Sequence, residues 1–377
     1  MVKKLYLRAM KIHNLGIVFL LWLSLAVAVF AEGVAPTDTV SHQADAAANI
    51  VSGQSAPDTT ILKSPEPDSS SQNITALPDS AYGWKITREP KLMIASLLFM
   101  KDALKHSKTL KDWPIFFVAA PMLTIDNSVE RDFLKMFSLK LGVGERLSPV
   151  DVGATASINL GLFHLLEFGV SGGLNSAWNY GGDGDFMGAY NPAKADFEGD
   201  LFLTEFAYNG QGKASLSIPM MMFLPKSKWT KIVLTAGASM TYHAYTGAPD
   251  GTPWTAGMEG GVNGIVEDYR LSLMYLFPFE QLKMAMVTMS YNGYLRSSYF
   301  DEIYKDYDPD YKTISINPML VFALKSQWSA MVMAPIVRER VYDREVYEGH
   351  ERFLMKKTGS EWTLKMVMFV LTYKLDI

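Results

Sequence analysis

The sequence predicts an all-β protein, a transmembrane antiparallel up-and-down β-barrel of about 12 strands, with roughly 10 to 14 allowed. Three observations lead to this fold class. Long segments alternate apolar and polar residues, connections alternate between short and long, and the one long apolar run lies at the N-terminus. Because a closed barrel pairs all of its backbone groups without an edge, it can cross a membrane without a spanning helix.

The N-terminus has the pattern of a secretory signal peptide over residues 1–31. Basic residues including Lys3, Lys4 and Arg8 precede the apolar run 15–31, which ends in small residues. An uncleaved membrane helix is the alternative, because a span needs about 20 residues. The next segment, 32–80, is acidic, rich in Ser, Ala and Pro, and has no aromatic residue. We expect it to be a disordered linker, since it has too little apolar surface to offset its ordering entropy.

Residues 150–162, VDVGATASINLGL, carry the clearest strand pattern. One set of alternate positions is Val, Val, Ala, Ala, Ile, Leu and Leu, and the other is Asp, Gly, Thr, Ser, Asn and Gly. Such a segment has one apolar and one polar face. A soluble sandwich would bury the apolar face, whereas a membrane barrel would turn it to lipid. The export signal, the long strands and the small residues of the polar face favour the barrel.

Further segments repeat this alternation along the region 113–377, which we predict to be the barrel. They are residues 137–143, 168–174, 232–244, 285–295, 314–324 and 367–377. Several are longer than the usual 5 to 6 residues of globular strands, as expected for strands that cross hydrocarbon at a tilt.

The connections form a short set and a long set. The short ones are 225–229, 277–281 and 325–328, and the long ones are 181–200, 296–310 and 343–360. In the second half of the chain they alternate, as the periplasmic turns and outer loops of membrane barrels do. Two short turns, KSKW and KSQW, place lysine beside tryptophan before an apolar strand, and KDW at residues 111–113 is similar.

The N-terminal half contains a conflict over strand direction. In residues 201–224 the apolar side chains stay at the same alternate positions throughout. A two-residue hairpin at Asn209 and Gly210 would shift them, so one parity favours a single strand. That makes 115–125 a strand running down from the outer side. The similarity of KDW to the short turns instead makes 115–125 run upward. A three-residue turn within 209–212 would reconcile the two.

Residues 81–112 are predicted to hold either an N-terminal helix or the first strand. Within them, 91–106 has apolar residues at Leu92, Met93, Leu97, Met100 and Leu104. This spacing favours a periplasmic or plug helix slightly over a strand.

Polar residues on the inward parity are candidates for lining the lumen, and aromatic residues at strand ends are candidates for an interface girdle. The lumen candidates are Asp151, Asn159, Glu167, Glu205, Lys213, Lys231, His243, Arg270, Lys374 and Asp376. The girdle candidates are Trp113, Trp229, Trp328 and Tyr373.

The composition and motifs point away from enzymatic or cofactor chemistry. The chain has no cysteine, which excludes disulfides, thiolate metal sites and a thiol nucleophile, and its net charge of −4 gives no reason to expect nucleic acid. Ser239, Thr241 and His243 share a strand face, but residues two apart on a strand are about 7 Å apart, too far for a nucleophile and its base. We therefore predict no catalytic, cofactor or metal site.

Three loop features are weaker candidates. His164 and His350 lack a second histidine at metal-ligand spacing. Asp183 and Asp185 lack the full pattern of a calcium loop. Residues 299–311 combine aromatic and acidic side chains, which suits either a ligand contact or a structural collar.

Together these features resemble bacterial outer-membrane β-barrel proteins over residues 110–377. The resemblance rests on the signal peptide, the alternating strands and the terminal segment FVLTYKLDI. That class usually ends in an aromatic residue, whereas this chain ends in Ile377, with Tyr373 the last aromatic residue on the same face. The resemblance implies location in the outer membrane, with its lipids and the barrel-assembly machinery as partners, and it leaves the oligomeric state undefined.

Three functions are compatible with this class. The first is a porin-like channel for small solutes or ions. The second is a non-transporting surface barrel that binds a ligand or partner through its outer loops, and the third is an outer-membrane lipid hydrolase. A barrel of about 12 strands lies between a filled interior and an open pore, so strand number leaves the choice open.

Overall fold

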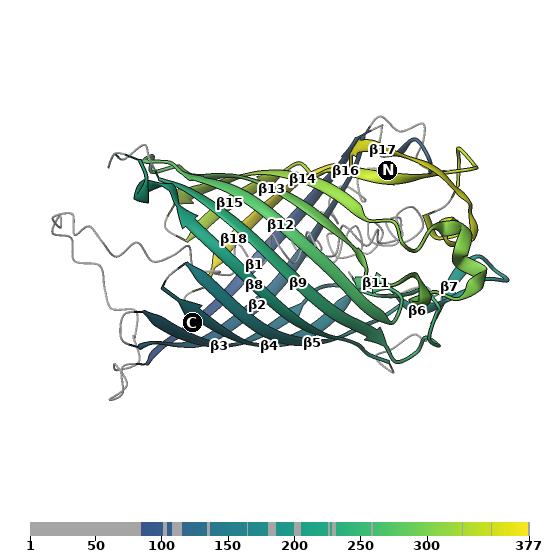
Figure 1. The fold of residues 1–377 in the computed structure, drawn as a ribbon, viewed down its shortest axis with the longest axis horizontal. Coiled ribbons are helices and arrows are strands. Elements are labelled where there is room, and N and C mark those ends of the chain that lie inside the picture. Colours follow the sequence, from purple (N-terminus) through teal and green to yellow (C-terminus); the bar gives the residue numbers. More distant parts are fainter. Residues whose placement is uncertain are drawn as a thin grey trace, which may run out of the picture.

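The structure, a computed structural model, describes residues 84–100, 104–107, 115–133, 136–163, 165–179, 186–199, 205–224, 227, 231–257, 259–325, 327–347 and 349–375. The predicted signal peptide at 1–31 and linker at 32–80 lie outside these residues. Within them, the chain forms a closed antiparallel barrel of twelve strands (Figure 1). The predicted fold class is confirmed.

The barrel strands pair in chain order, and β1 pairs with β18 to close the ring. Ten of them are uninterrupted, and the first eight of these are β1 (Lys85–Met100), β2 (Ile115–Phe133), β3 (Phe137–Leu147), β4 (Asp151–Leu162), β5 (Leu166–Ala177), β8 (Ala207–Pro219), β9 (Ile232–Tyr245) and β12 (Gly264–Leu276). They are followed by β13 (Leu282–Tyr294) and β14 (Thr313–Lys325).

The last two barrel strands are each interrupted once. β15 (Trp328–Met333) and β16 (Ile336–Tyr342) both pair with β14, so they are two halves of one strand. The break contains Pro335, which has no N–H to give to the ladder. β17 (Lys357–Leu364) and β18 (Met366–Lys374) pair with β16 and β15 respectively and form the final strand.

The two ends of the barrel differ in their connections. One end, called here the turn end, has the short turns between β2 and β3, β4 and β5, β12 and β13, and β14 and β15. The other end, the loop end, has the long connections after β5, β9, β13 and β16. The loop after β5 carries β6 (Met187–Asn191) and β7 (Asp196–Glu198), and the loop after β9 carries β10 (Trp254–Ala256) and β11 (Glu259–Gly261); β6, β7 and β11 are labelled at the right of Figure 1. β1 begins and β18 ends at the turn end.

The structure corrects the prediction for residues 91–106. The helix is wrong over 91–100, because β1 is an extended strand paired with β2 on one side and β18 on the other. The helix-like spacing arose because apolar residues occupy both faces of this strand. Leu92 is exposed on the outside, whereas Met93 and Leu97 are buried on the inside.

The conflict over strand direction is also resolved. β8 is one uninterrupted strand, paired with β5 and β9, so no hairpin occurs at Asn209 and Gly210. β2 therefore runs from the loop end to the turn end, as the parity argument requires. The resemblance of KDW to the two short turns is misleading, because residues 101–114 connect β1 and β2 at the loop end.

The outer face of the barrel is apolar, as the alternation predicts for a surface in contact with lipid. On β4 and β5, Ile158 is 55% exposed and Val170 is 65% exposed. Side chains of this size would not be left in water at such exposure without a cost of about 1.5–3 kcal/mol each. The apolar set of 150–162 therefore faces outward, and the set containing Ser157 faces the interior.

Aromatic residues mark both borders of this apolar surface. Near the loop end, exposed tyrosines lie on four adjacent strands, with ring centroids 6.3 Å apart for Tyr208 and Tyr242 and 6.4 Å apart for Tyr269 and Tyr291. At the turn end, the rings of Trp328 and Tyr373 are 4.7 Å apart. Such aromatic borders are typical of the two interfaces of a membrane barrel.

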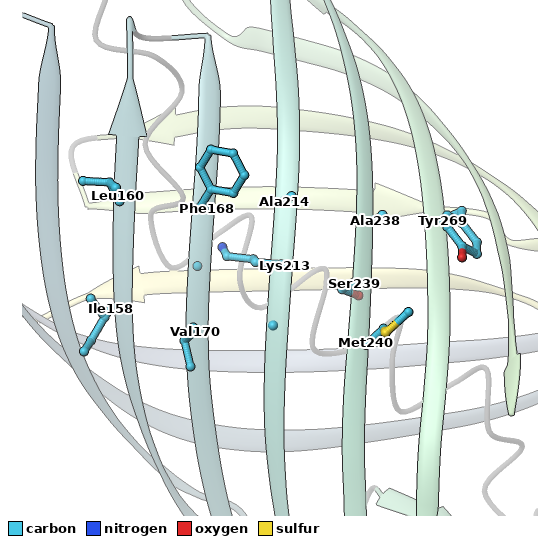
Figure 2. Close-up of a pocket in the computed structure, with 12 residues that line it drawn as sticks. Ile158, Leu160, Phe168, Val170, Lys213, Ala214, Ala238, Ser239, Met240 and Tyr269 are labelled. Carbon is cyan, nitrogen blue, oxygen red and sulfur yellow. The ribbon is translucent and has the colours of Figure 1, made fainter. Parts of the chain in front are cut away.

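A shallow groove of about 580 Å³ interrupts the outer face over β4, β5, β8, β9 and β12. Figure 2 shows Ile158 and Val170 on one side of it, Met240 and Tyr269 on the other, and Ala214 between them. The groove exists because β8 and β9 carry small residues on their outward parity. Among the described residues, no helix is both long and apolar enough to cross a membrane.

Arginine introduced at two neighbouring positions of β4 tests the assignment of faces. We expect Ile158→Arg to lower stability by about 2–4 kcal/mol and to block membrane assembly, because it places a charge in lipid. Ser157→Arg, whose side chain faces the interior, should assemble normally. The heat-modifiable band on unboiled gels measures assembly, and equal assembly of the two variants would contradict the assignment.

Candidate functional site: the barrel lumen

The inward face of the barrel is divided into a polar and an apolar sector. The polar sector covers β3, β4, β5, β8, β9 and β12, whose inward residues are mainly Gly, Ser, Thr, Asn and Gln. Several of its hydroxyl groups pair across strands, including Ser217 with Thr235 and Ser272 with Thr288, each at 2.9 Å. Small paired hydroxyls project little into the barrel, so this sector leaves room for water.

Glycines let longer side chains lie flat against the wall of the polar sector. A Cβ at Gly169 would collide with the Lys213 side chain, which crosses it to form an ion pair of 2.9 Å with Glu167. Figure 2 shows Lys213 extending from β8 toward β5. The absence of a side chain at Gly169 thus keeps this ion pair along the wall.

Asp151 is the most enclosed of the predicted lumen residues. Its carboxylate is fully buried and accepts hydrogen bonds from the Arg146 guanidinium at 2.8 Å and from the Ser148 hydroxyl. The Ser148 hydroxyl in turn accepts hydrogen bonds from the backbone N–H groups of Val150 and Asp151, at 3.2 and 3.0 Å. This network holds the tight turn between β3 and β4 at the loop end.

A second charged cluster lies inside the turn end. Lys91 on β1 is buried and forms ion pairs with Glu89 at 2.9 Å and with Asp126 on β2 at 3.5 Å. Lys374 on β18 pairs with Glu89 at 3.1 Å. Two cations and two carboxylates therefore join three strands across the β1–β18 closure.

His243 lies at the loop end of β9 in a tightly packed aromatic environment. Its Nε2 is 3.1 Å from the Tyr294 hydroxyl, and its ring is 5.4 Å from that of Trp254. Ser239 and Thr241 lie on the same face of β9. The geometry thus supplies a buried histidine that is within hydrogen-bond distance of a tyrosine and packed against aromatic rings.

The other predicted lumen residues occupy varied positions. Glu205 accepts a hydrogen bond from the Tyr245 hydroxyl, and Arg270 is 2.5 Å from Asp268. Lys231 is exposed at the turn end, and the Oδ1 atom of Asn159 is buried with no hydrogen-bond partner among the described residues. Asp376, Trp113 and Trp229 lie outside the described residues.

The long loops of the loop end form an ordered structure of their own, called here the cap. Its sheet, in the order β11, β10, β6 and β7, joins the long loop after β5 to the one after β9. Asn179 fixes the start of β6, because its Oδ1 accepts from the backbone N–H groups of Phe186 and Met187, both at 2.9 Å. Asn175 on β5 donates to the Ala256 carbonyl at 3.0 Å and so ties β10 to the barrel.

The aromatic loop at 299–311 packs into this cap. Tyr304 and Tyr307 are 1% and 2% exposed, and the Tyr307 ring stacks on Tyr342 at 6.1 Å. Burial, with Asp301 nearby, raises the pKa of Tyr304 to about 12. The two tyrosines are therefore part of a packed collar and are not presented to an external ligand.

The apolar sector of the lumen was not anticipated from the sequence. Buried apolar residues line the inner face of β1, β2, β14, β15 and β18, including Met93, Met331 and Met368. The available signal was a loss of alternation: the segment 366–371, MVMFVL, is apolar at both parities. Among the described residues, no group of His, Cys, Asp or Glu could hold a metal ion.

No protein-family model matches the sequence, and no curated protein matches it. Among solved structures, the chain is similar to an outer membrane channel from Pseudomonas putida F1, with 7% identity and a TM-score of 0.37 over 76% of this chain and 96% of that one. The NanC porin matches with 7% identity and a TM-score of 0.33 over 76% and 100%. The outer membrane channel DcaP of Acinetobacter baumannii matches with 8% identity and a TM-score of 0.33 over 78% and 99%.

The strand pairing and the two faces of the barrel wall define the fold independently of these similarities.

Two matched substitutions compare a buried carboxylate of the lumen with a partly exposed one. Asp151→Asn should lower the free energy of unfolding by about 3–5 kcal/mol, because it removes the buried carboxylate charge that pairs with the Arg146 guanidinium. Glu167→Gln should cost less than about 1 kcal/mol, since the Glu167 side chain is 43% exposed. Urea unfolding of the refolded barrel measures both, and a larger loss for Glu167→Gln would refute this ranking.

Proposed function

We propose that the protein is a porin-like channel of the bacterial outer membrane that passes small solutes or ions. The proposal rests mainly on the polar sector of the lumen, where small hydroxyl and glycine residues extend along β4, β5, β8 and β9 from one end to the other. Water-compatible groups of this size, on the inside of a closed barrel, are what a passage for hydrated solutes requires.

The charges of the lumen support this proposal. Glu167 and Lys213 pair with each other and remain partly exposed, so they contribute a polar wall without a strong net field. The charged cluster of Lys91, Glu89, Asp126 and Lys374 lies on one side of the barrel interior at the turn end. We propose that Asn159, Glu205, Lys231, Arg270 and Asp376 line the same passage, whereas the buried Asp151 and His243 support its wall.

The apolar outer surface of the barrel indicates which molecules surround it. We propose that outer-membrane lipids surround the apolar face between its two aromatic borders, and that the barrel-assembly machinery inserts the chain during biogenesis. β18 alternates, with Phe369 and Tyr373 outward and Thr372 inward, and this pattern fits the terminal strand of an outer-membrane barrel.

The ordered cap favours a second function, a surface barrel that binds a ligand or partner through its outer loops. The cap has its own sheet and its own buried aromatic cluster, including Tyr190, Phe300 and Phe353. Loops this well packed present a fixed surface. This function needs no open passage, so conductance separates the two.

Single-channel recording in a planar bilayer tests the channel. We expect the refolded protein to conduct ions, and Ser157→Arg and Ser157→Asp to shift ion selectivity in opposite directions, toward anions and cations respectively. A unit charge a few ångströms from the ion path is worth about 1 kcal/mol at the dielectric constant of water, or up to about fivefold in the permeability ratio.

The control for this experiment is Ala156→Ser, because residue 156 lies on the lipid-facing parity of the same strand. It should leave selectivity unchanged. A refolded, heat-modifiable barrel with no conductance at any voltage would overturn the channel and leave the loop-binding function.

A further inference from the structure

The groove on the outer face of the barrel has a floor of small residues. This floor, called here the trough, consists of Gly210, Gly212 and Ala214 on β8 and Ala238 on β9. Strand register places Val170 of β5 and Met240 of β9 directly opposite Gly212, one on each side (Figure 2). Both side chains are exposed and form walls of the groove. The trough is therefore accessible from outside the barrel.

The packing of the described residues does not require the two glycines of the trough. A Cβ at Gly210 or Gly212 would meet no atom within 4 Å. Neither residue has the left-handed backbone that favours glycine, and glycine weakens a strand. By contrast, Gly169 on the adjacent strand faces the lumen and is needed by the Lys213 side chain that crosses it. The glycines of the trough instead keep open a space that lies outside the protein.

The side chains around the trough suit a hydrocarbon occupant. Aliphatic, aromatic and thioether groups form its walls, including Phe168, Val170 and Met240. Lys213 and Ser239 also border the groove, but they occupy the alternate positions of their strands, on the lumen-facing parity. An occupant therefore has to be apolar along the length of the trough.

The length and position of the trough match one leaflet of a bilayer. Its loop end lies beside Tyr208 and Tyr242 of the aromatic border, and its other end is Ala214, near the middle of β8. The strand segment from Tyr208 to Ala214 is about 20 Å long. At a strand tilt of about 35–45°, this length covers about 15 Å along the membrane normal, half of a hydrocarbon core of about 30 Å.

We propose that the trough retains one acyl chain of a membrane lipid from the leaflet at the loop end. The chain lies along β8 from the tyrosines to Ala214, and the headgroup lies at the level of the aromatic border. Because bilayer and groove are both apolar, the gain comes from close packing of the chain against the walls. The site is on the outside of the wall, so it does not depend on the proposed channel.

A second copy of the chain is a poorer occupant than a lipid. In an isologous dimer, the same surface patch of both copies meets itself. Two troughs that face each other leave a void between them, and a void forfeits the dispersion contacts that hold an interface together within a membrane. A flexible acyl chain can instead follow the trough along its length.

Retention of a photoreactive lipid tests the proposal. The full-length protein is refolded in vesicles of palmitoyl-oleoyl phosphatidylcholine that contain a phosphatidylcholine with a diazirine in its acyl chain. It is then transferred to octyl glucoside micelles, which dilute ordinary boundary lipid, and illuminated. We expect adducts at Met240, beside the trough, to exceed those at Met289 by at least about fivefold. Met289 is a similarly exposed methionine on the lipid-facing side of β13 and controls for chemistry and exposure.

Filling the trough provides a second measurement. Gly212→Ile places a β-branched side chain in the open space, where it suits a strand, so the heat-modifiable barrel should still form. Native mass spectrometry should find one phosphatidylcholine retained on the unmodified protein and at least about fivefold less on this variant. Ala285→Ile adds the same side chain at a lipid-facing position of β13 and should retain lipid like the unmodified protein. The comparison of Met240 with Met289 decides the matter if Gly212→Ile does not refold.

The remaining outcomes overturn the proposal. Equal labelling of Met240 and Met289, or no retained lipid, means that the groove holds only exchanging boundary lipid. A dimeric mass without lipid, lost in Gly212→Ile, means that a second copy covers the trough. Conductance is measured separately, so the channel can fail while the lipid site stands, and the reverse.

Discussion

The pairing of β1 with β18 is the interaction on which the rest of the structure depends. Inside a bilayer, each unpaired backbone N–H or C=O costs several kcal/mol, so a sheet can cross only if it has no edge. This ladder joins residues separated by nearly the whole described chain, from Lys91 opposite Lys374 to Phe99 opposite Met366. Once it forms, the wall has an inside and an outside, and every alternating strand has a defined solvent on each face.

The closure also determines how side-chain chemistry is distributed. On β4 the alternation of polar and apolar residues simply separates water from lipid. On β1 and β18, both parities carry apolar residues, because the inner face there belongs to the methionine cluster. The barrel is therefore asymmetric about its axis: small hydroxyl residues line one side, and the other side carries thioethers together with the ion-pair cluster at the turn end.

Much of this architecture could be predicted from the sequence, and the reasons are local. The strict alternation of 150–162 defined a strand and its two faces, and the constant parity of 201–224 correctly excluded a hairpin. The failures arose where the signal was not local. Residues 91–100 looked helical because both faces are apolar, and only their partners on β2 and β18 show why. The buried network around Asp151 likewise depends on Arg146 lying across a turn, which composition could not indicate.

The cap described at the loop end has a consequence for the order of folding. Its central pairing joins β6, which follows β5, to β10, which follows β9, and an isolated bridge links Gly251 to Phe300 beyond β13. These segments are distant in sequence and meet only after β5, β8, β9, β12 and β13 have aligned. Because the entropy of closing such long loops must be offset before any contact is gained, the cap is a late structure. A barrel whose strands have aligned but whose long loops have not yet paired would thus have a complete wall and an unstructured loop end.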